Sequence, residues 1–199
     1  MAPLFFETVR IKDGEIYHIH YHNLRLNTTM QCHFPGHDPV DLRNYIDPPK
    51  EGLYRCKITY SNTILSVEYF PYIPKSIRSF TIIPIDFEYS FKYLDRKNIE
   101  KAIAMVSTDD AIFVKDGLLT DTSIANIAFL YKKSWITPKK PLLFGTTRMR
   151  FIEARKLQEA DIEVDDLEKF EQMAIMNAMI DFVPLPSVTI QSQRRIYAL

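Results

Sequence analysis

The sequence of 199 residues has few cysteines, no net charge and no long apolar run. Its two cysteines, Cys32 and Cys56, provide neither a disulfide framework nor a Cys-x-x-Cys pair, which is typical of the reducing cytoplasm. Basic and acidic residues balance at 25 each, so nothing favours binding to nucleic acid phosphates. No stretch approaches the ~18 apolar residues of a membrane helix, and the start lacks the features of a secretory signal. We therefore expect a cytoplasmic protein that binds neither nucleic acid nor membrane.

The composition is that of a folded protein, with 46% hydrophobic and 13% aromatic residues. The length allows one domain or two small ones. Two prolines within Pro71–Lys75 disfavour both helix and central strand, and so predict a linker. The chain then divides into a small strand-rich domain, residues 1–72, and a larger α/β domain, residues 73–199. Ligands favour clefts between such domains.

Turn residues predict three β-hairpins. Asp13-Gly14 and Asp116-Gly117 each separate two strand-like runs, and Asp-Gly suits the positive backbone angles of a tight hairpin turn. Ser61-Asn62 joins 54–60 to 64–70, two runs rich in aromatic and β-branched residues. The predicted helices are residues 22–31, 95–106 and 147–160, with a shorter turn over 38–45 capped by Asp38.

Two clusters suggest binding sites when residue type and spacing alone are considered. Gly145-Thr146-Thr147-Arg148 opens a predicted helix, whose free N–H groups and dipole attract anions. A plain threonine cap is the simpler interpretation of that segment. His18, His20 and His22 alternate and would share one strand face as metal ligands do. Because no nearby acid or cysteine completes a ligand set, we predict no metal site.

Two further features are ambiguous on spacing alone. Asp121-Thr122-Ser123 with Asn126 has the composition of a turn or cap cluster. Lys92 lies between Phe91 and Tyr93, where partial burial would lower its pKa, as a lysine that condenses with a carbonyl group requires. A lysine that extends from an apolar edge to solvent is the commoner explanation.

Taken in chain order, these segments resemble the fold-type IV (class IV) pyridoxal-phosphate aminotransferases and lyases, most closely the aminodeoxychorismate lyase branch. The resemblance spans nearly the whole chain and is carried by five motifs: Phe6-Glu7-Thr8-Val9-Arg10 with Asp13-Gly14 and His22-x-x-Arg25-Leu26; Lys92-x-Leu94-x-Arg96; Asp116-Gly117-x-x-Thr120-Asp121-x-Ser123-x-x-Asn126; Trp135-x-Thr137-Pro138 leading to Pro141-Leu142-Leu143-x-Gly145-Thr146-Thr147-Arg148; and Asn177-Ala178-Met179 before Val183-Pro184.

The resemblance implies a pyridoxal 5′-phosphate site and a role for each matching residue. Lys92 would bond covalently to the cofactor, and Asp121 would face its pyridine nitrogen. The phosphate would be held by Arg25 and the Gly145–Thr147 helix start, with Asn177 a weaker candidate. Thr122, Ser123 and Asn126 complete the cofactor-binding segment. His22 would be an ordinary helix residue.

The resemblance also implies a fold, a reaction and an assembly. The fold is the two-domain fold-type IV architecture of the D-amino acid aminotransferases, α+β or α/β, and here it is expected to be N-terminally shortened. The site residue Asp121 replaces the family's usual Glu. The family's sites lie at a subunit interface, which implies a homodimer. Candidate substrate contacts are Glu7, Thr8, Arg10 and Arg96.

Three functions follow from the resemblance. The first is a lyase that splits 4-amino-4-deoxychorismate, a small molecule, into 4-aminobenzoate and pyruvate. It is favoured by Lys92-x-Leu94-x-Arg96 and by Lys97, where branched-chain transaminases usually have Tyr. The second is an aminotransferase acting on a branched-chain or D-amino acid. The third is a non-catalytic relative that keeps the fold as a binding module.

Overall fold

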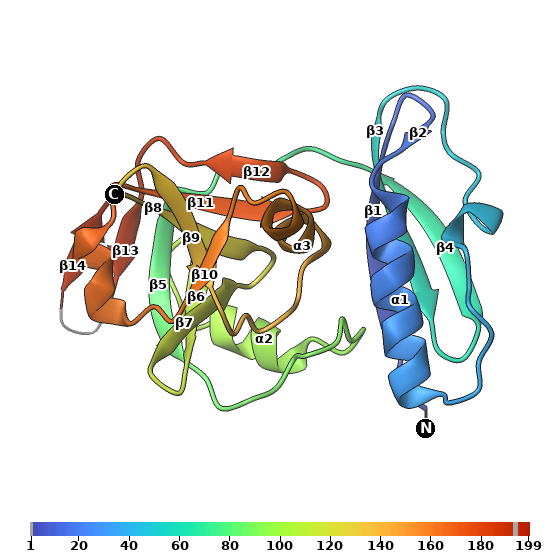
Figure 1. Cartoon of the computed structure of the whole chain (residues 1–199), viewed down its shortest axis with the longest axis horizontal. Helices are drawn as coiled ribbons and strands as arrows, with labels where there is room; N and C mark the ends of the chain where they lie inside the picture. The colour runs from blue at the N-terminus through green and yellow to red at the C-terminus, as the bar shows by residue number, and fades with distance from the viewer. Residues whose placement is uncertain (1, 193–194) are drawn as a thin grey trace. The chain divides into compact units, whose positions relative to one another are not determined.

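The computed structural model describes residues 2–192 and 195–199. The chain forms two compact units (Figure 1). Unit 1 comprises Met1–Pro74 and Phe91–Asp95, and unit 2 comprises Lys75–Ser90 and Arg96–Leu199. Among the described residues, no helix has the length and apolar character needed to cross a bilayer.

Unit 1 is a four-stranded antiparallel sheet with a helix on one face. The strands have the order β2-β1-β3-β4, and their bounds are β1 (Phe5–Lys12), β2 (Glu15–Ile16), β3 (Leu53–Tyr60) and β4 (Ile64–Pro71). Both expected hairpins of this unit are confirmed. Asp13 and Gly14 have the positive φ angles, 50° and 81°, that the first turn requires.

Helix α1 (Ile19–His33) packs its apolar side against this sheet. Ile19, Leu26 and Met30 are buried on the helix, and they pack with Val9 and Ile11 of β1. The helix begins three residues earlier than expected. The predicted cap at Asp38 is wrong, because the side chain of Asp41 accepts the Arg43 N–H and so opens the short 3-10 helix η1 (Leu42–Asn44).

Unit 2 contains a ten-stranded mixed sheet. Eight strands follow the order β10-β9-β8-β7-β6-β5-β13-β14, and β11 pairs with β8 and β12. The bounds of the strands are β5 (Ser79–Pro84), β6 (Asp110–Lys115), β7 (Leu118–Thr122), β8 (Asn126–Tyr131), β9 (Ser134–Pro138), β10 (Gln158–Ala160), β11 (Gln172–Asn177), β12 (Asp181–Pro184), β13 (Thr189–Gln191) and β14 (Ile196–Ala198). The helices are α2 (Lys97–Ile103), α3 (Thr146–Glu153) and the 3-10 helix η2 (Val164–Lys169). The expected β6–β7 hairpin at Asp116-Gly117 is confirmed.

Helix α3 is shorter than the sequence predicts. It ends at Glu153, where the prediction continued to Ala160. Arg155 takes a left-handed conformation with φ 55°, and the Lys156 N–H returns to the Phe151 carbonyl at 2.9 Å, which is the usual hydrogen bonding of a helix end. The following residues pair with β9 as strand β10. Tertiary strand pairing therefore overrides the apolar spacing that suggested a longer helix.

The unit boundaries differ from the expected domains at the segment that contains Lys92. Phe91–Asp95 belongs to unit 1, whereas the sequence placed it in the larger domain. The Phe6 N–H donates to the Lys92 carbonyl at 3.0 Å, and the Leu94 N–H donates to the Leu4 carbonyl at 2.8 Å. The rings of Phe91 and Tyr93 pack against Phe5. These contacts extend the sheet of unit 1 along the free edge of β1.

Candidate functional site

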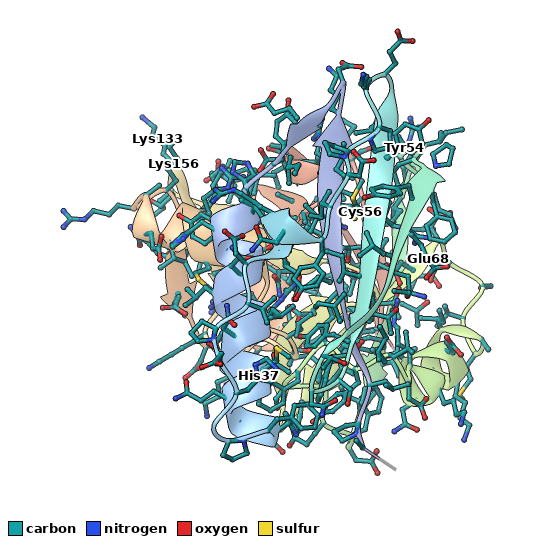
Figure 2. All side chains as sticks on the ribbon, turned by 90° about the vertical axis from the view of Figure 1, so that its right-hand side faces the viewer. His37, Tyr54, Cys56, Glu68, Lys133 and Lys156 are labelled. Carbon is teal, nitrogen blue, oxygen red and sulfur yellow. The ribbon has the colours of Figure 1, made fainter. Side chains whose placement is uncertain are left out.

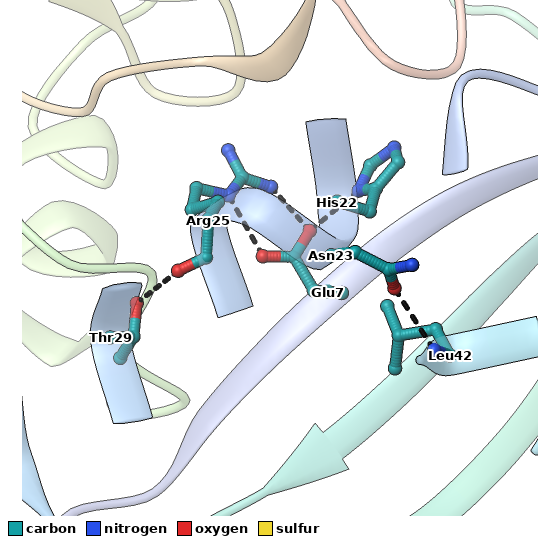
Figure 3. A network of polar contacts seen from close by, with 6 residues as sticks. All are labelled: Glu7, His22, Asn23, Arg25, Thr29 and Leu42. Atoms are coloured by element: carbon teal, nitrogen blue, oxygen red, sulfur yellow. Dashed lines mark hydrogen bonds and ion pairs between the residues drawn. The ribbon is translucent and has the colours of Figure 1, made fainter. Parts of the chain in front are cut away.

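A buried ionic network joins β1 to α1 in unit 1 (Figure 3). The Arg25 guanidinium binds the Glu7 carboxylate with both prongs, Nε to Oε1 at 2.8 Å and an Nη to Oε2 at 2.6 Å. His22 Nδ1 lies 2.6 Å from the same Oε2. His22 and Arg25 are three residues apart on α1, so they share the helix face that meets Glu7. Two parallel hydrogen bonds fix the guanidinium plane of Arg25.

The network sets the charge of each member. Burial by itself would raise the pKa of Glu7, but the Arg25 charge and the hydrogen bonds from His22 and Arg25 lower it to about 2. Burial lowers the pKa of His22, against the opposing hydrogen bond to Glu7. His22 is therefore neutral at pH 7 and donates through Nδ1, because an ionised carboxylate only accepts.

The network bears on two of the expectations. Glu7 is 0% exposed, and both of its carboxylate oxygens are held by α1. It therefore positions Arg25, and its role as a substrate contact stays a prediction. His22 is a buried helix residue that belongs to the network. Since side chains alternate along a strand, Thr8 and Arg10 lie on the sheet face opposite to Glu7.

Lys92 lies on that opposite face. Its neighbour Tyr93 forms an antiparallel bridge with Phe5, which puts Lys92 beside Phe6. The Lys92 ammonium lies 4.6 Å from the centre of the Phe6 ring. Its positive charge also contributes to the lowered pKa of His22. The predicted catalytic lysine, the Arg25 network and the β1 residues therefore all belong to unit 1, with Lys92 on the sheet face opposite to the network.

A second buried carboxyl group, that of Asp121, lies near the end of β7 in unit 2. Asn126 Nδ2 donates to its Oδ1 at 2.6 Å, and the Leu143 N–H donates to its Oδ2 at 2.8 Å. Burial raises the pKa of Asp121 to about 7, although these hydrogen bonds and the charge of Arg148 oppose the rise. The two groups that donate these hydrogen bonds are uncharged. They offset only part of the effect of burial, so the pKa of the carboxyl group stays near 7.

The start of α3 lies directly beside this carboxyl group. A Cβ on Gly145 would lie 1.9 Å from Asn126 Oδ1, so only glycine fits between the helix start and the Asn126 amide. Thr146 and Thr147 are both buried. The first N–H groups of a helix have no intrahelical acceptor and carry partial positive charge. The expected phosphate-binding element and the expected ring-binding acid are thus adjacent in unit 2.

The sequence and fold of this chain match known proteins. Residues 88–188 match the class IV amino-transferase family. An uncharacterised protein of Haemophilus influenzae is 36% identical over 187 residues, covering 90% of this chain and 98% of that protein. A crystal structure from Haemophilus somnus, provisionally assigned as a 4-amino-4-deoxychorismate lyase, is 33% identical, with a TM-score of 0.83, covering 89% of this chain and 96% of that one. The chain belongs to the class IV aminotransferase family.

The expected fold class is confirmed by this membership and by a more distant structure. A hypothetical aminotransferase of Mycobacterium tuberculosis in its pyridoxal-phosphate-bound form shares the fold, with a TM-score of 0.74 at 17% identity, over 92% of this chain and 80% of that one. As a class IV aminotransferase family member, the protein is a pyridoxal-phosphate-dependent enzyme.

The residues present suit that cofactor. The backbone at Gly145, which cannot carry a Cβ, and the start of α3 provide donors for a phosphate. The buried carboxyl group of Asp121 provides an acceptor for a ring nitrogen. Each oxygen of a carboxylate can accept more than one hydrogen bond, so the bonds from Asn126 and Leu143 leave capacity for a ligand.

Other predicted cofactor or substrate residues of this class IV enzyme hold the loop after β7 in shape. Thr122 Oγ1 accepts from the Ala125 N–H at 3.1 Å. Arg96 donates to the Ser123 carbonyl at 2.5 Å. The Asn177 amide donates to the Ile124 carbonyl at 3.2 Å and accepts from the Met179 N–H at 2.9 Å. These side chains fix the backbone around Asp121. The turn or cap composition of residues 121–126 indicated this role for Thr122, but nothing indicated it for Arg96 or Asn177.

Two residues with clear roles were not singled out by the sequence. His22 was considered only within the alternating set of His18, His20 and His22 and as part of the His22-x-x-Arg25 spacing, although that spacing itself places both side chains on one helix face. Arg148 is 3% exposed and donates to the Pro138 carbonyl at 2.8 Å and to Glu159 at 2.6 Å. Among the described residues, no three His, Cys, Asp or Glu side chains gather as a metal set.

Proposed function

We propose that this enzyme is a 4-amino-4-deoxychorismate lyase, which converts its substrate to 4-aminobenzoate and pyruvate. The observation that carries the choice is the 33% identical structure provisionally assigned to that activity, which matches over nearly the whole of both chains. A lyase of Pseudomonas aeruginosa with this activity shares the fold at 13% identity and a TM-score of 0.74. Lys97, in place of the tyrosine usual in branched-chain transaminases, supports the same choice.

The chemistry assigns separate tasks to the residues of the two units. Bound pyridoxal phosphate supplies an aldehyde that condenses with amines and a ring that accepts an electron pair. We assign the covalent bond to the Lys92 amine, and the phosphate to Arg25 together with Gly145, Thr146 and Thr147. Glu7 and His22 hold the Arg25 fork at a fixed angle. Asp121 accepts a hydrogen bond from the ring nitrogen and stabilises its positive charge.

Lys92 also handles the protons of the reaction. With the cofactor bound, the Lys92 amine would take the proton from the amine-bearing carbon of the substrate. Breaking the bond between the ring and the enolpyruvyl oxygen would release the three-carbon fragment as enolpyruvate and leave the ring aromatic. The protonated Lys92 would then give its proton to the methylene carbon of that fragment, which becomes pyruvate. One group thus acts as nucleophile, base and acid in turn.

The test is product formation by the cofactor-loaded protein. Purified protein mixed with 4-amino-4-deoxychorismate should release pyruvate, measured through lactate dehydrogenase, and an equal amount of 4-aminobenzoate, measured by fluorescence. Lys92→Ala should abolish both products, whereas Lys97→Ala, a change in a neighbouring lysine, should retain them. Absence of pyruvate from the wild-type protein would reject the lyase assignment.

A second candidate is a class IV aminotransferase that uses a branched-chain or D-amino acid. The name of the matching family favours it. The same Lys92, Arg25 and Asp121 would serve, but the amino group would pass to a keto acid. Adding such an amino acid without a keto acid should then shift the cofactor absorbance to that of the amine form, which the lyase assignment does not predict.

A further inference from the structure

Four aromatic rings gather beside β1 in unit 1, and we call them the edge cluster. They belong to Phe5 of β1, His33 of α1, and Phe91 and Tyr93 of the lysine segment, which we define as Phe91–Asp95. Each pair of these rings has its centroids 4.6 to 6.3 Å apart, which is the range of favourable aromatic packing. The cluster shares the α1 side of the sheet with Cys56 of β3, which is labelled in Figure 2. One packed group of rings therefore joins β1, α1 and the lysine segment.

The lysine segment is a short addition to the sheet. Among the described residues, two backbone hydrogen bonds attach it to β1, one through the Lys92 carbonyl and one through the Leu94 N–H. The Tyr93 N–H returns to the Phe91 carbonyl at 2.9 Å, which closes a three-residue turn centred on Lys92. A segment with so few hydrogen bonds opens easily unless side-chain packing holds it. The rings of the edge cluster provide that packing.

The two rings of the segment also decide where Lys92 points. Neighbouring residues of a strand direct their side chains to opposite faces of the sheet. Phe91 and Tyr93 pack against Phe5 on the α1 side. The Lys92 ammonium lies on the other side, 4.6 Å from the centre of the Phe6 ring. Loss of the packing around Phe91 and Tyr93 would free the segment to slip, and Lys92 would then leave its position.

His33 is the member of the edge cluster that α1 supplies. It follows Leu26 by seven residues and Met30 by three, so its ring extends from the buried side of the helix. The centre of its ring lies 4.6 Å from that of Phe91 and 4.7 Å from that of Phe5. His33 Nε2 is buried and has no hydrogen-bond partner in the part of the chain that the structure describes. Since no hydrogen bond through Nε2 accounts for a histidine here, we attribute its role to the packing of its ring.

We propose that His33 is a positioning residue for Lys92: its ring completes the edge cluster, and the cluster holds the lysine segment so that the Lys92 amine stays where its chemistry requires it. The proposal rests on the proposed function, which assigns the covalent bond and the proton transfers to Lys92. His33 acts through Phe91 and Tyr93, the neighbours of Lys92 on either side. A residue in the last turn of α1 thus supports the reaction from the other side of the sheet.

The first measurement uses the cofactor-free protein, so it does not depend on the reaction. Hydrogen exchange of the Leu94 amide, followed by NMR, reports the opening of the lysine segment. His33→Ala removes three ring contacts, and the Leu94 amide should then exchange about tenfold faster. His33→Phe keeps an aromatic ring and should restore slow exchange. Leu42→Ala, at a buried position of the same unit, is the matched control. It should speed exchange in β3 and leave that of Leu94 as in wild type.

The second measurement follows the bond between Lys92 and added pyridoxal phosphate. In that step the amine nitrogen replaces the aldehyde oxygen, which leaves as water, and the visible absorbance of the protein grows. A misplaced amine reacts more slowly, so the rate should fall roughly 10- to 100-fold in His33→Ala. It should stay near that of wild type in His33→Phe and in Leu42→Ala, because both keep four aromatic rings in the edge cluster. In the pyruvate assay His33→Ala should lower kcat and leave KM nearly unchanged.

A second variant reaches the same segment from its own side. Phe91→Leu removes one ring of the lysine segment and keeps an apolar side chain. It should also speed exchange of the Leu94 amide and slow the formation of the cofactor bond. It therefore replaces His33→Ala in both measurements if that variant does not fold.

The outcomes separate the role of His33 from the lyase assignment. Slow bond formation in His33→Ala, together with a wild-type protein that makes no pyruvate, would support the role of His33 and reject the lyase. Pyruvate formation by wild type, together with an unchanged rate of bond formation in His33→Ala, would overturn the role of His33 and leave the lyase standing. A His33→Phe protein as slow as His33→Ala would also overturn it, as would a wild-type cofactor bond that maps to another lysine.

Discussion

Two of the buried carboxyl groups, Glu7 in unit 1 and Asp121 in unit 2, have pKa values that are shifted in opposite directions. Glu7 on β1 is 0% exposed and Asp121 on β7 is 4% exposed. Their pKa values nevertheless lie at about 2 and about 7. Burial is the largest influence on both groups and raises both pKa values. The surrounding partners therefore decide the outcome.

The partners differ in charge. Glu7 receives two hydrogen bonds from the Arg25 cation and one from neutral His22. Asp121 receives its hydrogen bonds from a neutral amide and a neutral backbone N–H. A buried carboxylate is stable when a cation compensates it. Glu7 has its cation built into the fold, whereas Asp121 is suited to a cation supplied by a ligand, such as the protonated ring nitrogen proposed for it.

The largest expected effect comes from Glu7→Gln. The change leaves the Arg25 guanidinium buried without its counter-ion, which typically costs about 3–5 kcal/mol. We expect a loss of this order in the free energy of unfolding of the cofactor-free protein at pH 7, measured by urea denaturation. Because the folded pKa of Glu7 is about 2, the difference should persist down to pH 5. Glu51→Gln, at an exposed position of unit 1, is the control and should change stability little. Equal stability of the two variants would show that the network contributes nothing.

Asp121→Asn tests the other half of the comparison through its pH dependence. In the wild type the folded carboxyl group keeps its proton up to about pH 7, whereas in the unfolded chain it loses the proton near the ordinary aspartate pKa of 3.8. Folding therefore takes up a proton between these values, and wild-type stability falls as pH rises through that window. Asparagine does not titrate. The stability of the variant relative to wild type should thus rise by about 1–3 kcal/mol between pH 5 and pH 8.

The control for this change is Asp165→Asn, at an exposed position in the same unit. Its stability relative to wild type should stay level over that range. A level profile for Asp121→Asn as well would mean that Asp121 is ionised throughout and that the contrast with Glu7 is absent. With cofactor loaded, the variant should also lose affinity for pyridoxal phosphate, measured from the visible absorbance during dilution.

Much of the fold could be predicted because its signals are local. The positive φ angles of Asp13, Gly14, Asp116 and Gly117 follow from the identity of two adjacent residues at each turn. The end of α3 was missed because it depends on pairing between Gln158–Ala160 and β9, which lies more than twenty residues earlier. Local spacing contains no information about such a partner.

In the candidate site, too, some features follow from local sequence and others depend on packing between distant segments. The residue types at Lys92, Asp121 and Gly145 could be picked out through motifs. The role of Glu7 could not, because its burial depends on partners 15 and 18 residues away on another element. The contact between Gly145 and Asn126 is likewise visible only once β8 and α3 are in place. Motifs identify which residues matter, while packing determines which of them touch a ligand.

Gly145→Ala should lower the free energy of unfolding by an intermediate amount and should weaken a hydrogen bond to Asp121. The φ of Gly145 is −73°, which alanine adopts without strain, so the cost is purely the clash with Asn126 Oδ1 at 1.9 Å. Such overpacking costs about 1–3 kcal/mol, measured by urea denaturation. Displacing Asn126 also weakens a hydrogen bond that opposes the rise in the pKa of Asp121. In an Asn126→Ser background the same substitution should cost clearly less; purely additive losses would contradict the steric explanation.

The smallest expected effect concerns His22, the neutral donor to Glu7. His22→Leu removes one hydrogen bond to a carboxylate that keeps its arginine, and should cost about 1–2 kcal/mol at pH 7. His22→Asn should cost less, because its amide can donate where Nδ1 does. Burial lowers the pKa of His22, so below pH 6.5 the unfolded chain binds a proton that the folded protein excludes, and wild-type stability falls as the solution is acidified. Both variants should lose this part of the pH dependence of stability between pH 7.5 and 5.5. If either variant lost stability on acidification as steeply as the wild type does, His22 would have to take up its proton in the folded protein as well.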